Sequence, residues 1–220
     1  TLSTRSIVIA AGAAPLVPPI PGLAEAGCLT SDTVWRLTEL PARLVVLGGG
    51  PIGCELAQAF ARLGSQVTLV EMAQRLLVRE DEDAAALVAQ ALRADGVALL
   101  TGHTAVRVDA SGAARQVLLR ATDGTEQALV YDELLCALGR APRVTGYGLE
   151  DLGIPLTPRQ TITTDAHLAT LYPNIYAVGD VAGPFQLTHV AAHQAWYAAV
   201  NALFGRLKRF RVDYHAIPWC

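Results

Sequence analysis

The sequence predicts an α/β fold built on a doubly wound parallel sheet, and three observations support this prediction. Residues 44–47 form a short apolar run with two valines, typical of a strand buried on both faces of a parallel sheet. A glycine-rich turn follows, and from Cys54 to Leu63 the apolar residues recur at helical spacing. A second apolar run, residues 67–70, ends in Glu71. Strand, turn, helix and strand in this order predict a βαβ unit.

The turn after the first strand has the spacing G-x-G-x-x-G. Its glycines are Gly48, Gly50 and Gly53, with Pro51 and Ile52 before the last. The first glycine allows a tight turn, the second lets the backbone approach a pyrophosphate, and the third lets the helix pack closely on the strand. The helix N-terminus then offers N–H groups and partial positive charge to the phosphates. In this context the turn predicts a Rossmann-like dinucleotide site, whereas the motif alone is also found in glycine-rich turns without a ligand.

Glu71 suggests which dinucleotide the site prefers. It ends the second strand about 20 residues after the turn, where a carboxylate can accept hydrogen bonds from the adenosine ribose hydroxyls. A ribose 2′-phosphate would be repelled by this negative charge. We therefore expect NAD(H) to be preferred over NADP(H).

The composition narrows the classes of partner. The net charge is −3 and the basic residues form no block, which argues against nucleic acid as a partner. Four prolines follow the short apolar run of residues 7–14, so a transmembrane helix is excluded there and no membrane association is expected. The cysteines are too far apart for a redox dithiol or a zinc knuckle, so we expect no metal site, a cytoplasmic location and free thiols at Cys28, Cys54, Cys136 and Cys220.

Further elements around the βαβ unit follow from periodicity and turn residues. A helix is expected from Asp81 to about Arg93, after a loop over residues 72–80, and a short helix capped by Ser31 or Asp32 is expected to end at Leu37. Strands are expected at residues 6–11, 97–100 and 134–138. Ser-Gly and Asp-Gly dipeptides predict an antiparallel meander over residues 105–110, 116–121 and 127–131.

The last third of the chain has a different composition. Residues 161–166 are expected to form a strand or edge segment, and residues 174–179 an apolar strand that ends at Gly179 and Asp180. A helix is expected from the segment around Thr188 to about Phe204.

Four motifs occur in a fixed order along the chain: AAG at residues 10–12, GGGPIG at 48–53, ALGRAP at 137–142 and NIYAVGD at 174–180. This series resembles the flavin-dependent pyridine nucleotide–disulfide oxidoreductases, in particular their dihydrolipoamide dehydrogenase and mercuric reductase branch. The resemblance implies an NAD-binding domain with a meander insertion, at residues 41–145, flanked by parts of an FAD-binding domain. Residues 1–40 would then be the end of its first segment with a connector, and residues 146–220 its returning segment.

The resemblance also implies roles for individual residues. Glu55 would lie near the nicotinamide, and Gly139 would close over the dinucleotide. Asp180 would hold the ribityl hydroxyls of FAD. The FAD site would further include Gly12, Gly179, and the helix N-terminus at Thr188, His189 and Val190, which would face the flavin pyrimidine edge. Packing or surface positions are the preferred interpretation of His189 and His193 themselves.

Several parts of the family pattern do not occur in this sequence. The first G-x-G-x-x-G, the C-x-x-x-x-C redox disulfide and the C-terminal dimerisation domain are missing, and two ATG triplets are AAG and ALG here. Since the chain also starts with Thr1 rather than Met, we expect it to be cut from a longer homodimeric protein. We expect no catalytic residue within it and no full reaction from it alone.

Two other hypotheses remain. The chain could be a stand-alone NAD-binding module with a structural or regulatory role and no flavin. It could also be a monofunctional NAD dehydrogenase, but no convincing His–Asp or Tyr–Lys constellation supports this third hypothesis.

Overall fold

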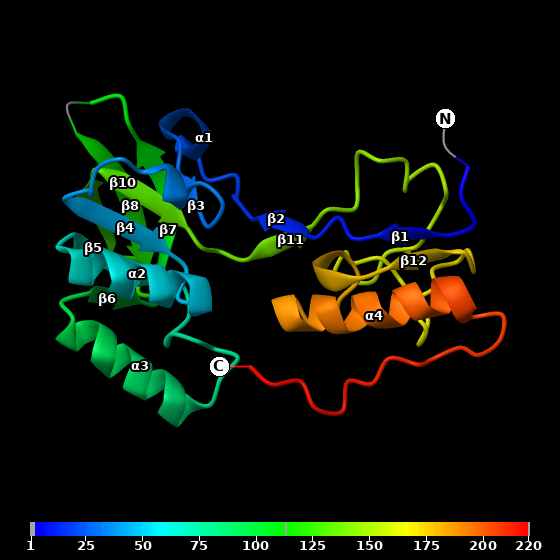
Figure 1. Cartoon of the computed structure of the whole chain (residues 1–220). Coiled ribbons are helices and arrows are strands. Elements are labelled where there is room, and N and C mark those ends of the chain that lie inside the picture. The colour runs from blue at the N-terminus through cyan, green and yellow to red at the C-terminus, as the bar shows by residue number, and fades with distance from the viewer. Residues whose placement is uncertain (1–2, 113, 220) are drawn as a thin grey trace. The chain divides into compact units, whose positions relative to one another are not determined.

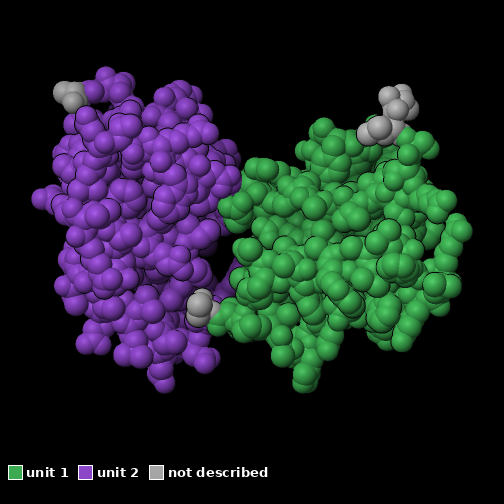
Figure 2. Space-filling view, in the orientation of Figure 1, with its two compact units in different colours: residues 1–14, 140–220 green, residues 15–139 purple. Residues whose placement is uncertain are grey.

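The computed structural model describes residues 3–112 and 114–219. The chain forms two compact units, one of residues 15–139 and one of residues 1–14 together with 140–220 (Figure 2). The second unit is thus made from both ends of the sequence. Among the described residues, no helix combines the length and apolarity needed to cross a bilayer.

The unit of residues 15–139 is built on a five-stranded parallel sheet. Its strand order is β3-β10-β4-β5-β6, where the strands are β3 (Leu29–Thr30), β4 (Arg43–Leu47), β5 (Gln66–Glu71), β6 (Ala98–Thr101) and β10 (Glu133–Cys136). The chain moves from β4 outwards to β5 and β6, then returns to place β10 on the other side of β4. The predicted doubly wound parallel sheet is confirmed, and its order reverses at β4, the strand that leads into the glycine turn.

Helices cover one face of this sheet (Figure 1). The helix α2 (Pro51–Leu63) has proline at its first position and ends at Gly64, which has a left-handed φ of 112°, as expected of a helix start and stop. The helix α3 (Glu82–Ala94) has acidic residues in its first turn, where they are favourable to the helix dipole. Both helices pack on alternate side chains of the central strands, including Leu44, Val46 and Leu69.

The predicted antiparallel meander is confirmed and packs on the opposite face of the sheet (Figure 1). Its strands are β7 (His103–Asp109), β8 (Arg115–Ala121) and β9 (Glu126–Tyr131), with β8 in the middle. Val117 and Leu119 of β8 are fully buried against the other set of alternate residues, among them Val45 and Leu47. The central strands are therefore buried on both faces, which explains their continuous apolar runs.

The other unit is smaller and less regular. Its strands β1 (Ile7–Ile9) and β12 (Ile175–Ala177) pair in parallel, and β2 (Ala13–Pro15) pairs with β11 (Arg140–Pro142). A short 3-10 turn, η2 (Gly179–Val181), and the long helix α4 (Thr188–Phe204) follow β12. The strand predicted over residues 174–179 is present but shorter, since it ends at Ala177, and the predicted helix to Phe204 is present.

Three features differ from the sequence prediction. A short helix, α1 (Leu23–Ala26), was not expected, and the helix expected up to Leu37 is a single 3-10 turn, η1 (Val34–Arg36). Residues 161–166 do not form a strand but make one isolated bridge, between Ile162 and Leu156. Of the two expectations for this segment, a strand or an edge segment, the strand is wrong because its backbone bonds go to separate segments: Thr161 C=O accepts from Thr157 N–H, whereas Ile162 N–H donates to Val181 C=O.

The compact units also divide at other residues than the predicted domains. The sequence placed boundaries at residues 41 and 145, whereas the units divide at residues 15 and 140. Residues 15–40 join the larger unit because β3 pairs with β10 and Leu23 is buried among the meander residues. The assignment of each segment to a cofactor domain stays a prediction.

Candidate functional site

The glycine turn between β4 and α2 is so tightly packed that two of its glycines admit no side chain. Gly48 has a φ of 109°, and a Cβ atom on it would overlap the carbonyl group of Ala137. A Cβ atom on Gly53 would overlap the carbonyl oxygen of Gly48. These close approaches join α2 to the end of β4 and both of them to the segment after β10, as the sequence motif predicts.

Gly50 differs from these two glycines. Its φ of −77° and ψ of −179° are open to any residue, and a Cβ atom on it would meet nothing within 4 Å. The space beside it is therefore not needed by the protein's own packing. It lies at the start of α2, whose first hydrogen bond runs from Cys54 N–H to Gly50 C=O, at 3.0 Å.

The N-terminus of α2, which begins beside this open space, carries donors without a helical acceptor. The N–H groups of the first turn, including those of Ile52 and Gly53, precede the first intrahelical bond and have no acceptor within the helix. Together with the helix dipole they favour an anion. The turn therefore fits a dinucleotide pyrophosphate: the backbone donors are present, and the one glycine beside them leaves the room that a phosphate needs.

The Glu71 carboxylate lies against the same turn. One oxygen accepts a hydrogen bond from the Gly49 N–H at 2.7 Å, and the other accepts one from the Ala73 N–H at 2.8 Å. The side chain is only half-buried. Each oxygen keeps a further lone pair, so the carboxylate can still accept hydrogen bonds from a ribose.

The segment after β10 completes this part of the sheet edge. Gly139 has a φ of 114°, and a Cβ atom on it would meet nothing within 4 Å. Gly48, Glu71 and Gly139 all follow the carboxyl ends of neighbouring strands, β4, β5 and β10. The structure thus brings these predicted residues together at the point where strand order reverses, the position at which open α/β sheets bind ligands.

Two neighbouring residues of α2 differ in their surroundings. Glu55 is exposed, so its carboxylate is free to meet a ligand. The Cys54 thiol is buried and lies 3.5 Å from the Gly49 carbonyl oxygen. Burial, reinforced by the charges of Glu71 and Glu55, raises its pKa to about 11, so Cys54 is a packing residue and not a nucleophile.

In the other unit, Arg140 links Ala13, the residue after Gly12, to Asp180. The Arg140 guanidinium donates a hydrogen bond to the Ala13 carbonyl oxygen at 2.7 Å, and its Nε lies 3.8 Å from an Asp180 oxygen. Gly12 has a φ of 68° with nothing near its Cβ position, and its carbonyl oxygen accepts a bond from Arg143 N–H. The segments that contain the AAG, ALGRAP and NIYAVGD motifs therefore meet in one place.

Gly179 begins the turn that presents Asp180. It has a φ of 74°, and its N–H donates to the side-chain oxygen of Gln194 at 2.6 Å. Gln194 is fully buried and also donates to the Gly183 carbonyl oxygen, at 2.6 Å, and to the Tyr214 hydroxyl, at 2.8 Å. The Gln194 side-chain amide thus fastens the segment from Gly179 to Gly183 to the helix α4.

The first turn of α4 exposes Thr188 and His189, whereas Val190 is fully buried. Val190 can therefore offer a ligand only its backbone N–H. The first helical bond joins Ala191 N–H to Leu187 C=O, so the three preceding N–H groups have no helical acceptor. His193 lies 2.7 Å from the Asp213 carbonyl oxygen and packs edge-on against Tyr197, which agrees with a packing role.

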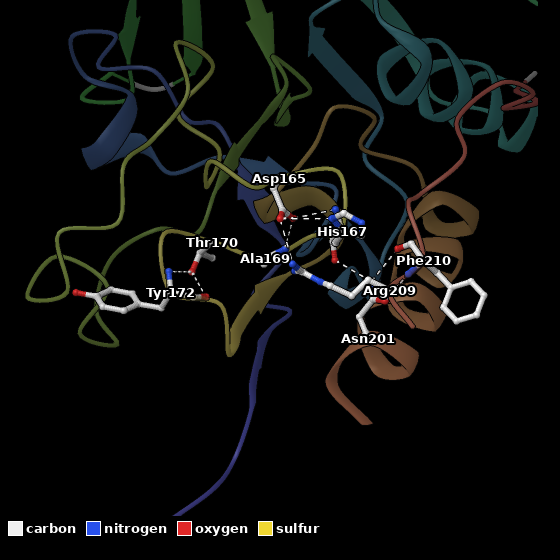
Figure 3. Close-up of polar contacts among 8 residues, drawn as sticks. All are labelled: Asp165, His167, Ala169, Thr170, Tyr172, Asn201, Arg209 and Phe210. Carbon is white, nitrogen blue, oxygen red and sulfur yellow. Dashed lines mark hydrogen bonds and ion pairs between the residues drawn. The ribbon is translucent and has the colours of Figure 1, made fainter. Parts of the chain in front are cut away.

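Buried amides of α4 were missed by the sequence prediction. The Asn201 side chain donates hydrogen bonds to the carbonyl oxygens of His167 and Phe210 and accepts one from Phe210 N–H (Figure 3). Nearby, the Asp165 carboxylate accepts hydrogen bonds from the N–H groups of His167 and Ala169 and lies 3.6 Å from the Arg209 guanidinium. Farther along this segment, the Thr170 hydroxyl bonds to the backbone C=O and N–H of Tyr172 and forms a turn (Figure 3). Gln194 and Asn201 lie two turns apart in an alanine-rich helix, a pattern that could have predicted a polar seam on its buried side.

The family profile of the pyridine nucleotide-disulphide oxidoreductases matches residues 1–195. The chain belongs to this family. Members of the family are enzymes that use a pyridine nucleotide and FAD, so the resemblance inferred from the four motifs is confirmed. Among the residues that the structure describes, no cluster of His, Cys, Asp and Glu could hold a metal ion.

The relatives include two kinds of enzyme. The chain is 36% identical over 217 residues to a mercuric reductase of Staphylococcus aureus, covering 99% of this chain and 39% of that protein. It is 40% identical over 196 residues to a dihydrolipoyl dehydrogenase of Bacillus subtilis, covering 89% of this chain and 42% of that protein. A solved structure, the Cu(II) complex of the HOCl-induced flavoprotein disulfide reductase RclA from Escherichia coli, superposes with a TM-score of 0.83 at 36% identity, over 93% of this chain and 46% of that one. The chain thus spans less than half the length of these relatives.

Proposed function

We propose that this chain is the nucleotide-binding core of an FAD-dependent oxidoreductase that takes electrons from NADH and passes them to a disulfide or a metal ion. The observation that supports this most strongly is the glycine turn, with open space beside Gly50 and, next to it, first-turn N–H groups of α2 that have no helical acceptor. The acceptor classes come from the relatives, which are named as a mercuric reductase and a dihydrolipoyl dehydrogenase. Because the chain spans less than half of those relatives, it should not perform the whole reaction alone.

In this proposal the larger unit binds the dinucleotide. The backbone N–H groups of Ile52 and Gly53 hold its pyrophosphate, and Glu71 accepts hydrogen bonds from the adenosine ribose. Gly139 lies over the dinucleotide, and the exposed Glu55 lies near its nicotinamide. Glu71 repels a 2′-phosphate and so favours NADH over NADPH.

The other unit contributes to the flavin site. A bound FAD would supply the hydride acceptance and two-electron transfer that no side chain of this chain can provide. Asp180 accepts hydrogen bonds from its ribityl hydroxyls, and Gly12 leaves room for the cofactor because nothing lies near its Cβ position. The N–H groups of Thr188, His189 and Val190 stabilise negative charge at the pyrimidine edge.

Two properties of the whole protein, its oligomeric state and its cellular location, are proposed from the family resemblance and the sequence. We propose a homodimer, since the family resemblance implies a dimerisation domain. A cytoplasmic location is proposed because the cysteines are widely spaced in the sequence and form no C-x-x-C or C-x-x-x-x-C motif.

A titration with NADH and NADPH tests the nucleotide preference. Wild-type chain should bind NADH with a micromolar Kd and NADPH more weakly, by calorimetry. The variant Glu71→Arg should lose or reverse this preference because the new cation attracts the 2′-phosphate. If both nucleotides bind equally well to wild type, Glu71 does not select NADH; a stable full-length protein that binds NADH but no flavin would favour the stand-alone NAD module.

A further inference from the structure

The loop between β5 and α3, residues 72–80, has no helix or strand, yet one side chain organises it. The Arg75 guanidinium donates hydrogen bonds to four backbone carbonyl oxygens of this loop: Leu76 at 3.4 Å, Leu77 at 3.0 Å, Val78 at 3.1 Å and Glu80 at 3.1 Å. A planar guanidinium with five donors can bind several acceptors at once, which an ammonium group cannot do in the same geometry. Arg75 therefore holds the backbone of the loop together by hydrogen bonds from one side chain.

The loop is attached to the glycine turn at its centre. Leu77 N–H donates to the Gly49 carbonyl oxygen at 2.8 Å. Leu77 has a φ of 48°, a left-handed conformation that a leucine rarely adopts. The bonds from Arg75 to the carbonyl oxygens on both sides of Leu77 hold the backbone in this conformation.

The beginning of the loop holds the Glu71 carboxylate. Ala73 N–H donates to one Glu71 oxygen, while the Ala73 carbonyl oxygen accepts a bond from Gly102 N–H at 2.8 Å. Gly49 N–H donates to the other Glu71 oxygen. The orientation of the carboxylate thus depends on the glycine turn on one side and on the loop on the other.

A pocket open to solvent, of about 150 Å³, lies between the loop, α3 and β6, and Arg75, Arg93 and Thr101 are among the residues that line it. Leu76 is the one fully buried side chain of residues 72–80. Leu76 and Leu77 anchor the middle of the loop in the apolar core of the larger unit. The backbone around them is held by hydrogen bonds, four of which Arg75 donates.

We propose that Arg75 is a positioning residue for the dinucleotide site, which fastens the 72–80 loop to the glycine turn and so fixes the Glu71 carboxylate for the adenosine ribose. This inference rests on the proposed NADH site. Arg75 is not expected to touch the phosphates, since its donors face the loop carbonyls. Its loss should therefore weaken the recognition of the ribose, and not the attraction of a polyanion in general.

Three variants of the whole 220-residue chain separate this role from its alternatives. Arg75→Ala removes the four hydrogen bonds to the loop, and Arg75→Lys keeps the positive charge but replaces the planar guanidinium with an ammonium group. Arg79→Ala is the matched control, since Arg79 is an exposed cation of the same loop. Each variant is titrated with NADH and NADPH by calorimetry, and its thermal midpoint and the amide hydrogen exchange of Leu77 are measured.

Arg75→Ala should weaken NADH binding roughly tenfold, because several hydrogen bonds are lost, and NADPH binding clearly less, so that the preference for NADH narrows. Leu77 N–H should exchange faster in this variant. Arg75→Lys should resemble Arg75→Ala, and Arg79→Ala should change the NADH affinity by less than about threefold.

The contrary outcomes are distinct. Full rescue by Arg75→Lys would mean that Arg75 acts by its charge, and equal losses of NADH and NADPH affinity would mean a general structural role; either overturns the proposal. An Arg75→Ala variant that binds NADH like a binding-competent wild type overturns the positioning role alone. Wild type that binds no NADH overturns the proposed function, and the positioning role with it.

Discussion

Substitution of Gly50 by alanine should separate binding from folding at the glycine turn. The added methyl group would meet no protein atom within 4 Å, and the backbone angles of Gly50 suit alanine. Replacing glycine by alanine at a compatible position stabilises a protein by about 0.4–1 kcal/mol, because the unfolded chain becomes less flexible. Gly50 is also the N-cap of α2, where alanine is less favourable than glycine by roughly 0.5–1 kcal/mol. The two effects oppose each other, so the Gly50→Ala variant should be about as stable as wild type.

The same methyl group should weaken NADH binding strongly. It would occupy the space in front of the α2 N-terminus and push the pyrophosphate away from the backbone donors. Hydrogen bonds to charged groups contribute about 1.5–3 kcal/mol each, so the loss of about 2–3 kcal/mol corresponds to roughly 30- to 150-fold in Kd.

Gly53→Ala is the matched control, with the opposite pattern. Its methyl group would overlap the Gly48 carbonyl oxygen, so folding itself should suffer, by about 1–3 kcal/mol as for overpacked sites. Urea denaturation and NADH calorimetry on the three proteins measure both quantities. Wild-type affinity in Gly50→Ala would refute the pyrophosphate site, and a destabilised Gly50→Ala would refute the open space beside it.

Three further outcomes follow from buried groups. The buried Tyr131 hydroxyl has no hydrogen-bond partner, so Tyr131→Phe should keep or raise the thermal midpoint, and a loss of more than about 1 kcal/mol would reveal a hidden partner. Gln194→Leu should lower the free energy of unfolding, measured by urea denaturation, by at least about 2–4 kcal/mol, because Gly179 N–H and Gly183 C=O lose their buried partner. A free energy of unfolding close to that of wild type would contradict this prediction. The Cys54 pKa of about 11 exceeds the unfolded value of about 8.5, so stability should fall as pH rises from 8.5 towards 11. The Cys54→Ser variant should lose this part of the pH dependence of stability. If its stability falls with pH as that of wild type does, Cys54 is not the group responsible.

The sequence predicted the central βαβ unit, the meander and the glycine turn because each depends on local chemistry. Alternating or continuous apolar runs follow from burial on one or two faces, and Gly48 and Gly53 are glycines for reasons that lie within the motif itself. The prediction that Glu71 lies at the turn needed only the length of the βαβ unit. Its bonds to Gly49 and Ala73 could not be predicted, since they depend on how the following loop returns.

Features that depend on distant partners were missed or misjudged. The pairing of β3 with β10 draws residues 15–40 into the larger unit, and nothing in their own sequence indicates it. Residues 161–166, expected as a strand or an edge segment, make only an isolated bridge at Ile162, because Ile162 N–H donates to the distant Val181 C=O and its side chain packs in the core of the smaller unit. Arg75 looks like an ordinary loop cation, and its four carbonyl partners exist only in the folded loop.

The most direct test of the central claim is an NMR titration of the ¹⁵N-labelled chain with NADH. Binding at the glycine turn should shift the backbone amide signals of Gly50, Ile52 and Gly53 most strongly, together with those of Glu71 and Gly139, and saturate at a micromolar Kd. The amides of the helix α4 should move far less, because they belong to the proposed flavin site. Saturable binding that leaves the amides of the turn unchanged, or no binding at all by the folded chain, would contradict the account.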